Sequence, residues 1–248
     1  MNVVWIKRDA RVLDHEPLSL AAAAKLPCVV LYIYEPDHLR SDCYHESHHR
    51  FINEALAELD AKLQAAAVGG EGGLTVRSGD AVDVLKALHS SLPIRHLFSH
   101  REVGNSISLL RDERITSWAA AAGIAWTQCR QDGVSDRRHE ELDEGSWANK
   151  WTQHMLRPQL PPPSRLLFVP SLTLPRAALL DAAACAVTHR GARPSAQTGG
   201  EAAARSVLRS FLERRGEGYC DELSSPLSGW DSCSRISPCA PPPPNPKP

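Results

Sequence analysis

Several familiar signatures are missing from this chain of 248 residues. It has no G-x-G-x-x-G, no Walker loop and no G-x-S-x-G, so nothing points to a dinucleotide fingerprint, a P-loop enzyme or an α/β-hydrolase. No apolar run reaches the roughly 18 residues that a membrane span needs. The N-terminus also lacks a basic region followed by an apolar stretch. A cytoplasmic protein without a membrane partner is therefore expected.

Cysteine spacing and net charge exclude further classes. The 7 cysteines are odd in number and include no C-x-x-C pair, which argues against a disulfide framework and favours a reducing compartment. The histidines of H-E-S-H-H, residues 45–49, lack the spacing of a zinc enzyme and are interpreted as a solvated helix start. No metal is expected. The net charge of −1 gives no general attraction to nucleic acid.

Strand and helix signals alternate over residues 1–130, which predicts an α/β fold with a parallel sheet covered on both faces. The predicted strands are residues 2–6, 28–34, 74–77, 96–99 and 125–127. Helical periodicity predicts helices at 18–24 and around 51–63. Asp80 is expected to cap the next helix. Asn105 or Ser106 is expected to begin the last one and Gly123 to end it. The inward residues predicted for that last helix are Ile107, Leu110, Trp118 and Ala122.

The character of the chain changes after residue 130. A helical turn around residues 147–155 leads into a proline-rich stretch, and residues 164–200 read as an extended connector with one short helix at 176–187. Helical periodicity resumes at 201–214, and the last ten residues are rich in proline, which is typical of disorder. The predicted divisions are 1–130 for the α/β domain, 131–200 for an extension and linker, 201–238 for a further helical segment, and 239–248 for a disordered tail.

Residues 2–17, NVVWIKRDARVLDHEP, hold the most informative pattern. A β-branched and aromatic run ends in Lys7-Arg8-Asp9, and ligands of open parallel sheets lie outside the carboxyl ends of the strands. The stretch from Val4 to Leu18 resembles the start of the photolyase/cryptochrome family, which runs V-W-hydrophobic-R/K-R-D-L-R and then D-N/H-x-P-L.

Three later stretches resemble the same family in the same order. Residues 31–36, LYIYEP, are similar to its second strand, which ends in an acid followed by proline. Residues 99–105, SHREVGN, resemble the S-H-x-E-x-G-N of its bacterial branch related to iron–sulfur photolyases. Residues 211–238 resemble the beginning of its helical flavin domain, which reads S-R-L-S-P.

The resemblance implies a doubly wound, Rossmann-like sheet of five strands in the order 3-2-1-4-5, followed by a linker and a fragment of an α-helical domain. It identifies the chain as the light-harvesting antenna domain of a photolyase/cryptochrome-like flavoprotein, cut at the start of its FAD domain. The parent reaction is blue-light-driven repair of pyrimidine dimers in DNA, or photoreception. This chain alone is expected to have no catalytic residue and to meet DNA only through the missing helical domain.

The same resemblance implies an antenna pigment, which is a ribityl-lumazine, a deazaflavin, a flavin or a folate. A flat heterocycle suits an apolar slot with a few carboxylates that accept from ring N–H groups and hydroxyls. Asp9, Glu35 and Glu102 are expected to converge on one cleft because each follows a strand. The candidate pigment-binding residues are Trp5, Lys7, Arg8, Asp9, Tyr34, Glu35, Glu102, Gly104 and Asn105.

The resemblance also implies a vestigial FAD site. Hydroxyl and backbone N–H groups at a helix start form an anion cradle, but Cys233 replaces the usual threonine and is a weaker hydrogen-bond partner. The matching residues are Tyr219, Cys233, Ser234, Ile236 and Ser237. Without the rest of the helical domain, helix 201–214 is expected to expose an apolar face, and residues 200–248 are expected to be poorly ordered.

Two alternatives remain open. One is a non-enzymatic signalling or partner-binding module that has the α/β fold and no chromophore. The other is a nucleotide-binding α/β enzyme of the adenine-hydrolase type. That class needs a glycine-rich phosphate loop after the first strand, and residues 7–11 contain no glycine.

Overall fold

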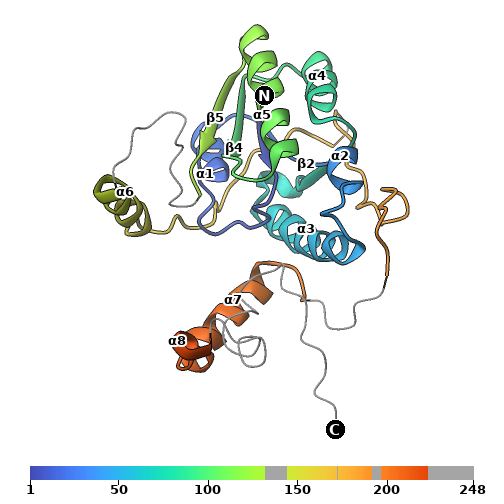
Figure 1. The fold of residues 1–248 in the computed structure, drawn as a ribbon. Coiled ribbons are helices and arrows are strands. Elements are labelled where there is room, and N and C mark those ends of the chain that lie inside the picture. Colours follow the sequence, from blue (N-terminus) through green and yellow to red (C-terminus); the bar gives the residue numbers. More distant parts are fainter. Residues whose placement is uncertain (132–143, 172, 192–196, 223–248) are drawn as a thin grey trace.

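The computed structural model describes residues 1–131, 144–171, 173–191 and 197–222. Within these residues, five parallel strands form one sheet in the order β3-β2-β1-β4-β5, as predicted (Figure 1). The strands are β1 (Asn2–Ile6), β2 (Cys28–Tyr34), β3 (Leu74–Ser78), β4 (His96–His100) and β5 (Ala125–Cys129). Strands β1 and β2 have the predicted bounds, and the other three end one or two residues later than predicted.

Strand β1 lies at the centre of the sheet, and all of its residues are buried. It pairs with β2 from Asn2–Cys28 to Ile6–Tyr32 and with β4 from Asn2–His96 to Trp5–Ser99. Because the three strands are parallel and nearly in step, their carboxyl ends reach the same edge of the sheet. The loops that follow β1, β2 and β4 therefore meet there.

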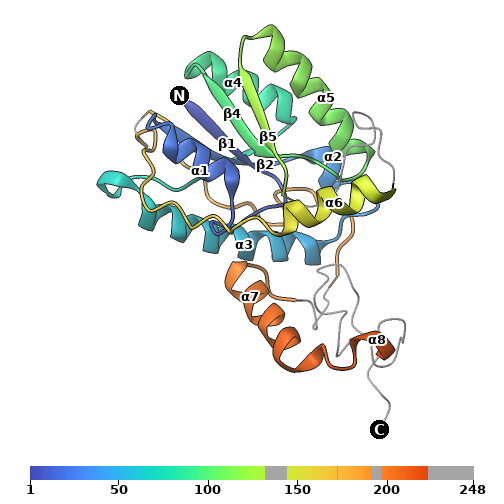
Figure 2. The same cartoon turned by 90° about the vertical axis from the view of Figure 1, so that its left-hand side faces the viewer.

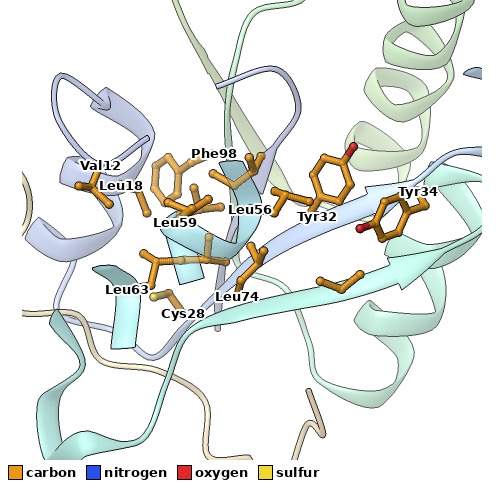
Figure 3. Packing of buried hydrophobic residues seen from close by; sticks show 14 of the residues in the cluster. Val12, Leu18, Cys28, Tyr32, Tyr34, Leu56, Leu59, Leu63, Leu74 and Phe98 are labelled. Atoms are coloured by element: carbon orange, nitrogen blue, oxygen red, sulfur yellow. The ribbon is translucent and has the colours of Figure 1, made fainter. Parts of the chain in front are cut away.

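Helices cover both faces of the sheet (Figures 1 and 2). Alternate residues of β1 enter two separate apolar clusters, since side chains of a strand alternate between faces. Val4 and Ile6 join the cluster on α1 (Glu16–Ala23) and α3 (Glu46–Ala66). Val3 and Trp5 join the cluster on α4 (Ala81–Ser91) and α5 (Ser106–Ala121). Figure 3 shows the first cluster, in which Leu56, Leu59 and Leu63 of α3 pack on the sheet.

Local capping signals are confirmed. Asp80 accepts from the backbone N–H groups of Val82 and Asp83 and begins α4. Asn105 accepts from Ser108 N at 3.1 Å and begins α5. Gly123 follows the end of α5 with φ +67°, a conformation that glycine adopts without strain. The remaining elements are α2 (Pro36–Leu39), the 3₁₀ turn η1 (Val68–Gly70), α6 (Glu144–Met155), α7 (Glu201–Ser210), the π turn η2 (Phe211–Arg215) and α8 (Tyr219–Glu222).

The prediction of a helix at residues 176–187 is wrong. The chain there forms a single turn, in which Cys185 N donates to Asp181 O, and the turn ends at Ala186 with φ +51°. Long-range contacts hold this segment instead: the Arg176 guanidinium binds Asp60 at 2.5 Å, and Leu180 O accepts from α3. Tertiary contacts have overridden local propensity.

The interpretation of H-E-S-H-H as a solvated helix start is also wrong for His49, which is 2% exposed. Its Nε2 lies 2.8 Å from Leu180 O and its Nδ1 lies 3.2 Å from Tyr44 Oη. His45 caps α3 by accepting from Ser47 N, and His48 Nδ1 accepts from His45 N. This histidine cluster therefore begins the helix and fixes it to residue 180.

Helix α7 is attached to α3 by its N-terminus and lies on the side of α3 away from the sheet (Figures 1 and 2). Glu54 and Glu58 of α3 accept backbone N–H groups from Gly199 and Ala202, and Lys62 Nζ lies 2.9 Å from Glu201. The apolar face expected over residues 201–214 is exposed at Leu208 of α7 (48%) and at Leu212 of η2 (73%), while Val207 and Phe211 are partly buried. The poor order predicted for residues 200–248 stays a prediction. None of the described helices is both long and apolar enough to cross a membrane.

Candidate functional site

The carboxyl edge of the sheet carries one tightly connected group of charges, here called the Arg111 cluster. Its members come from the loops after β1, β2 and β4 and from the first half of α5. They are Lys7, Arg8, Glu35, Glu102, Arg111 and Asp112. Four of these were predicted site residues; Arg111 and Asp112 were not.

Arg111 holds the cluster together, because each of its guanidinium nitrogens faces a different carboxylate. Nη1 lies 2.6 Å from Glu35 Oε1, Nη2 lies 3.0 Å from Glu102 Oε2, and Nε lies 2.9 Å from Asp112 Oδ1. Charge-assisted bonds of this kind are short and strong. Two of the predicted carboxylates, Glu35 and Glu102, thus converge as expected, and a buried cation brings them together.

Sequence reasoning missed Arg111 because it misassigned the inward face in the first half of α5, whereas Trp118 and Ala122 at its end pack against the apolar cluster as predicted. The predicted inward residue Leu110 is 60% exposed. The residues that α5 buries are Ser108, Arg111, Asp112, Ile115 and Ala119. The sequence did offer a signal: Arg111 and Asp112 follow Ser108 by three and four residues and so share its helix face with Ile115. Charges on a buried helix face need partners, which points to an ion-pair cluster there.

Two cations lie over the buried ring of Trp5. Lys7 Nζ is 5.0 Å and the Arg111 guanidinium carbon is 4.7 Å from the ring centroid. Trp5 itself is 1% exposed and forms the floor beneath the cluster. Lys7 also binds Asp112 at 2.9 Å, while burial lowers the pKa of Lys7. Cation–π attraction and the ion pair together stabilise these buried charges.

Gly104 allows the loop after β4 to close around Glu102. A Cβ at residue 104 would lie 2.6 Å from Glu102 Oε1 and 2.7 Å from Arg8 Nη2. Glu102 Oε1 accepts from Val103 N at 3.1 Å and from Gly104 N at 2.8 Å. Burial opposes ionisation of Glu102, but Arg8 and the other two cations outweigh it and hold its pKa below the ordinary value.

Two other predicted site residues have structural roles. Asn105 accepts from both the backbone and the hydroxyl of Ser108 as the cap of α5. Tyr34 is fully buried in the α1/α3 cluster, and its hydroxyl donates to Asn53 at 2.6 Å. Tyr34 therefore lies away from the Arg111 cluster, because its side chain points to the other face of the sheet.

Asp9 does not join Glu35 and Glu102. It forms a second buried group, the Asp9 cluster, with His15 at the start of α1 and His100 at the end of β4. Its Oδ2 is bonded to His100 Nδ1, and its Oδ1 accepts from Lys7 N at 2.8 Å. Burial opposes ionisation of Asp9, but the histidines outweigh it and hold its pKa well below the ordinary value. The convergence predicted for three carboxylates is thus observed for two.

The Asp9 cluster has the composition of a metal site, and its ligand atoms lie within 4.8 Å of one another. Its hydrogen bonding argues against a metal. His15 Nδ1 accepts from Leu18 N at 3.2 Å, so the proton of a neutral imidazole is on Nε2. That Nε2 lies 3.0 Å from Asp9 Oδ2, without good hydrogen-bond geometry. A protonated nitrogen has no lone pair to give to a metal ion.

The predicted FAD residues are only partly described. Tyr219 is 38% exposed and its ring packs edge-on against Phe211 at 5.6 Å. Cys233, Ser234, Ile236 and Ser237 lie outside the described residues.

Glu35 should make the stability of the protein fall with pH, and Glu35→Gln should remove that fall. Burial raises the pKa of Glu35 from 4.5 to about 7 despite Arg111. The folded state therefore takes up a proton that the unfolded state has lost, and stability present below pH 4.5 is lost as the pH rises to 7. We expect Glu35→Gln to be more stable than the wild type by about 3 kcal/mol at pH 8, and no more stable at pH 4. Urea denaturation at both pH values measures this.

Glu102→Gln is the matched control for Glu35→Gln, because the pKa of Glu102 is shifted the other way. Its ionised form stabilises the fold above pH 4.5, so this variant should be less stable than the wild type at pH 8. If both variants change stability in the same direction at pH 8, the assignment of opposite roles to the two carboxylates is wrong.

Comparison with known proteins places the chain in a family. Residues 2–156 match the family model of DNA photolyase. Cryptochrome-1 of Arabidopsis thaliana is 31% identical over 131 residues, which are 50% of this chain and 18% of that protein. Cryptochrome DASH of Gloeobacter violaceus is 33% identical over 106 residues, which are 41% of this chain and 20% of that protein. The chain thus spans about a fifth of the length of these curated relatives.

Solved structures share the fold. A bacterial class III photolyase from Agrobacterium tumefaciens superposes with a TM-score of 0.66 at 17% identity, over 88% of this chain and 46% of that one. A Synechocystis cryptochrome gives 0.61 at 20% identity, over 89% and 48%. An archaeal photolyase from Sulfolobus tokodaii, solved with two FAD molecules, gives 0.60 at 18% identity, over 87% and 48%. Because the family match covers more than half of the sequence, the chain belongs to the DNA photolyase family, that of the photolyases and cryptochromes.

Proposed function

We propose that this chain binds an antenna pigment at the carboxyl edge of its sheet and serves as the light-harvesting α/β domain of a photolyase/cryptochrome-like flavoprotein. The observation that carries the proposal is the convergence of Glu35 and Glu102 on Arg111 above the ring of Trp5. A few converging polar groups beside an apolar floor are typical of small-molecule sites. The edge is also where open α/β sheets bind ligands.

The residues of the site divide into two groups by what they touch. Arg8 and Glu35, with side chains 56% and 15% exposed, are the groups offered to a pigment. Glu102, at 4%, holds Arg8 and Arg111 in place from beneath, and Gly104 keeps that loop close to them. Asp9 acts indirectly, because its Oδ1 holds the backbone of Lys7. The pigment is a ribityl-lumazine, a deazaflavin, a flavin or a folate.

The rest of the proposed assignment concerns the parent protein. Residues 1–130 form the antenna domain, 131–200 the extension and linker, 201–238 the start of the FAD domain and 239–248 a tail. The parent activity is blue-light-driven repair of pyrimidine dimers or photoreception, with FAD and DNA bound through the helical domain of the parent protein. This chain by itself absorbs and passes on light energy and breaks no bond.

Reconstitution tests the proposal. The purified chain is titrated with FMN, riboflavin, a deazaflavin, a methenylated folate and a ribityl-lumazine, and binding is measured by pigment fluorescence. We expect one class to bind, and Gly104→Ala to weaken it at least about tenfold, since a Cβ there displaces Arg8 and Glu102. Arg114→Met, on the same helix but paired with Asp80, is the control and should bind normally.

Two results would contradict the proposal: no pigment binds, or binding is unchanged in Gly104→Ala. A colourless protein favours the partner-binding alternative.

One observation supports that alternative. Helix α6 exposes three large apolar side chains at a spacing of four residues, Trp147 by 47%, Trp151 by 43% and Met155 by 48%. Such a stripe on a helix is a typical protein-docking face.

A further inference from the structure

Glu35 is the least firmly held of the three carboxylates on Arg111. Each oxygen of Asp112 has a cationic partner, and Glu102 accepts from Arg111 and from two backbone N–H groups. Among the described residues, the carboxylate of Glu35 accepts one hydrogen bond, from Arg111 Nη1, and it makes no cap bond to α2. Its side chain is 15% exposed, against 4% for Glu102 and 11% for Asp112.

The charges of the cluster balance only while Glu35 is ionised. Three cations, Lys7, Arg8 and Arg111, face three acids when Glu35, Glu102 and Asp112 are all charged. Protonation of Glu35 leaves one excess positive charge and frees Nη1 of Arg111. A guanidinium N–H beside an excess positive charge is a good partner for a carboxylate or phosphate oxygen.

We propose that Glu35 competes with the pigment for Arg111: an anionic group of the pigment binds Nη1 in place of the Glu35 carboxylate, which takes up one proton from solvent as it is displaced. This inference rests on the proposed pigment site and names its ligand class, a pigment that carries a phosphate or a carboxylate. A neutral pigment of the same ring system gains nothing from the exchange.

The surroundings of Glu35 set the pH range of this exchange. The titratable and charged groups that face it are Arg111 and Asp112 on α5, Lys7 after β1 and Tyr32 on β2. Burial raises the pKa of Tyr32 well above its ordinary value, so this phenol stays neutral over the pH range considered. Burial raises the pKa of Glu35 to about 7, so above pH 7 anion binding should weaken by up to about tenfold per pH unit. His38 of α2 lies beside Ser108, and burial and two arginines lower its pKa. It is therefore neutral above pH 7 and does not produce this dependence.

Sulfate tests the exchange without any pigment, because its charge is constant over this pH range. Calorimetric titration of the full chain in two buffers with different heats of ionisation counts the protons taken up. We expect about one proton per sulfate at pH 8.5 for the wild type, none for Glu35→Gln, and an affinity in Glu35→Gln that does not change with pH. His38→Asn should behave as the wild type. Failure of sulfate to bind, or proton uptake that persists in Glu35→Gln, overturns the inference.

FMN and riboflavin then separate the inference from the proposed function, since they differ by one phosphate. FMN should lose about tenfold in affinity from pH 7.5 to 8.5 in the wild type but not in Glu35→Gln, and riboflavin should show no change. If sulfate takes up a proton but none of the tested pigments binds, the antenna proposal fails and the exchange at Glu35 stands. If FMN binds without this pH dependence, the exchange fails and the pigment site stands.

Discussion

Arg111→Met should lower the free energy of unfolding by about 3–5 kcal/mol at pH 7.5, the usual cost of removing one partner from a buried ion pair. The substitution keeps most of the side-chain volume, so packing changes little. It leaves Glu35, Glu102 and Asp112 facing one another, with side chains 15%, 4% and 11% exposed. Lys7 still neutralises Asp112, but within the described part of the chain Glu35 has no other cation in hydrogen-bond contact. Urea denaturation measures the loss.

The pH dependence of this loss identifies its cause. Without Arg111, Glu35 and Glu102 ionise less readily in the folded state, so the variant should regain stability as the pH falls towards 5. Glu35→Gln in the Arg111→Met background should recover part of the loss at pH 7.5. The control is Arg114→Met: Arg114 is also on α5, but its side chain is 54% exposed and it pairs with Asp80. Exposed pairs contribute up to about 1 kcal/mol. A loss below that value for Arg111→Met would show that the cluster does not depend on this cation.

The sheet could be predicted from the sequence because its signals are local. Strands buried on both faces of a parallel sheet read as continuous apolar runs, and CVVLYIY of β2 is such a run. Caps are equally local: Asp80 bonds the N–H groups two and three residues ahead of it. The strand order came from the family resemblance, because nothing in the strands themselves fixes which neighbours pair.

The site was predicted only in part, because its connections are between distant residues. Strand ends showed where Glu35 and Glu102 would lie, but the partner that joins them is on α5. Asp9 and Glu102 are both acids after strands, yet Asp9 meets the histidines of α1 and β4 while Glu102 meets Arg111. Which face of the sheet each loop turns towards depends on helix packing, and single-sequence periodicity does not determine it.

The errors outside the site have the same origin. Residues 176–187 contain good helix formers, but Leu180 O accepts from Asn53 and lies 2.8 Å from His49 Nε2, both on α3. Arg176 bonds to Asp60 and to the carbonyls of Gly72 and Leu74. Contacts more than a hundred residues apart in sequence satisfy groups that a helix would otherwise have used.

Asp9→Asn is expected to have the second large effect, again a loss of about 3–5 kcal/mol in the free energy of unfolding. An asparagine can still accept from Lys7 N, but its amide N–H groups then face His15 and His100. His15 cannot accept them, because its Nδ1 already accepts from Leu18 N at the start of α1. The buried amide N–H of the asparagine then faces the N–H of His15, and neither donor has an acceptor. This costs more free energy than the lost attraction between Asp9 and the histidines alone. Urea denaturation at pH 7 measures this loss.

The sign of the pH effect distinguishes Asp9 from Arg111. The pKa of Asp9 is well below 3.8 in the folded protein, so its contribution is complete above that value and is lost only as the pH falls through the folded pKa. The deficit of Asp9→Asn should therefore persist at pH 5, where Arg111→Met recovers. Asp42→Asn is the matched control, since Asp42 also faces a histidine, His189 at 3.6 Å, but is fully exposed; it should be indistinguishable from the wild type. If Asp9→Asn also leaves the free energy of unfolding unchanged, contacts other than the Asp9 cluster hold the loop that carries Lys7 to the Arg111 cluster.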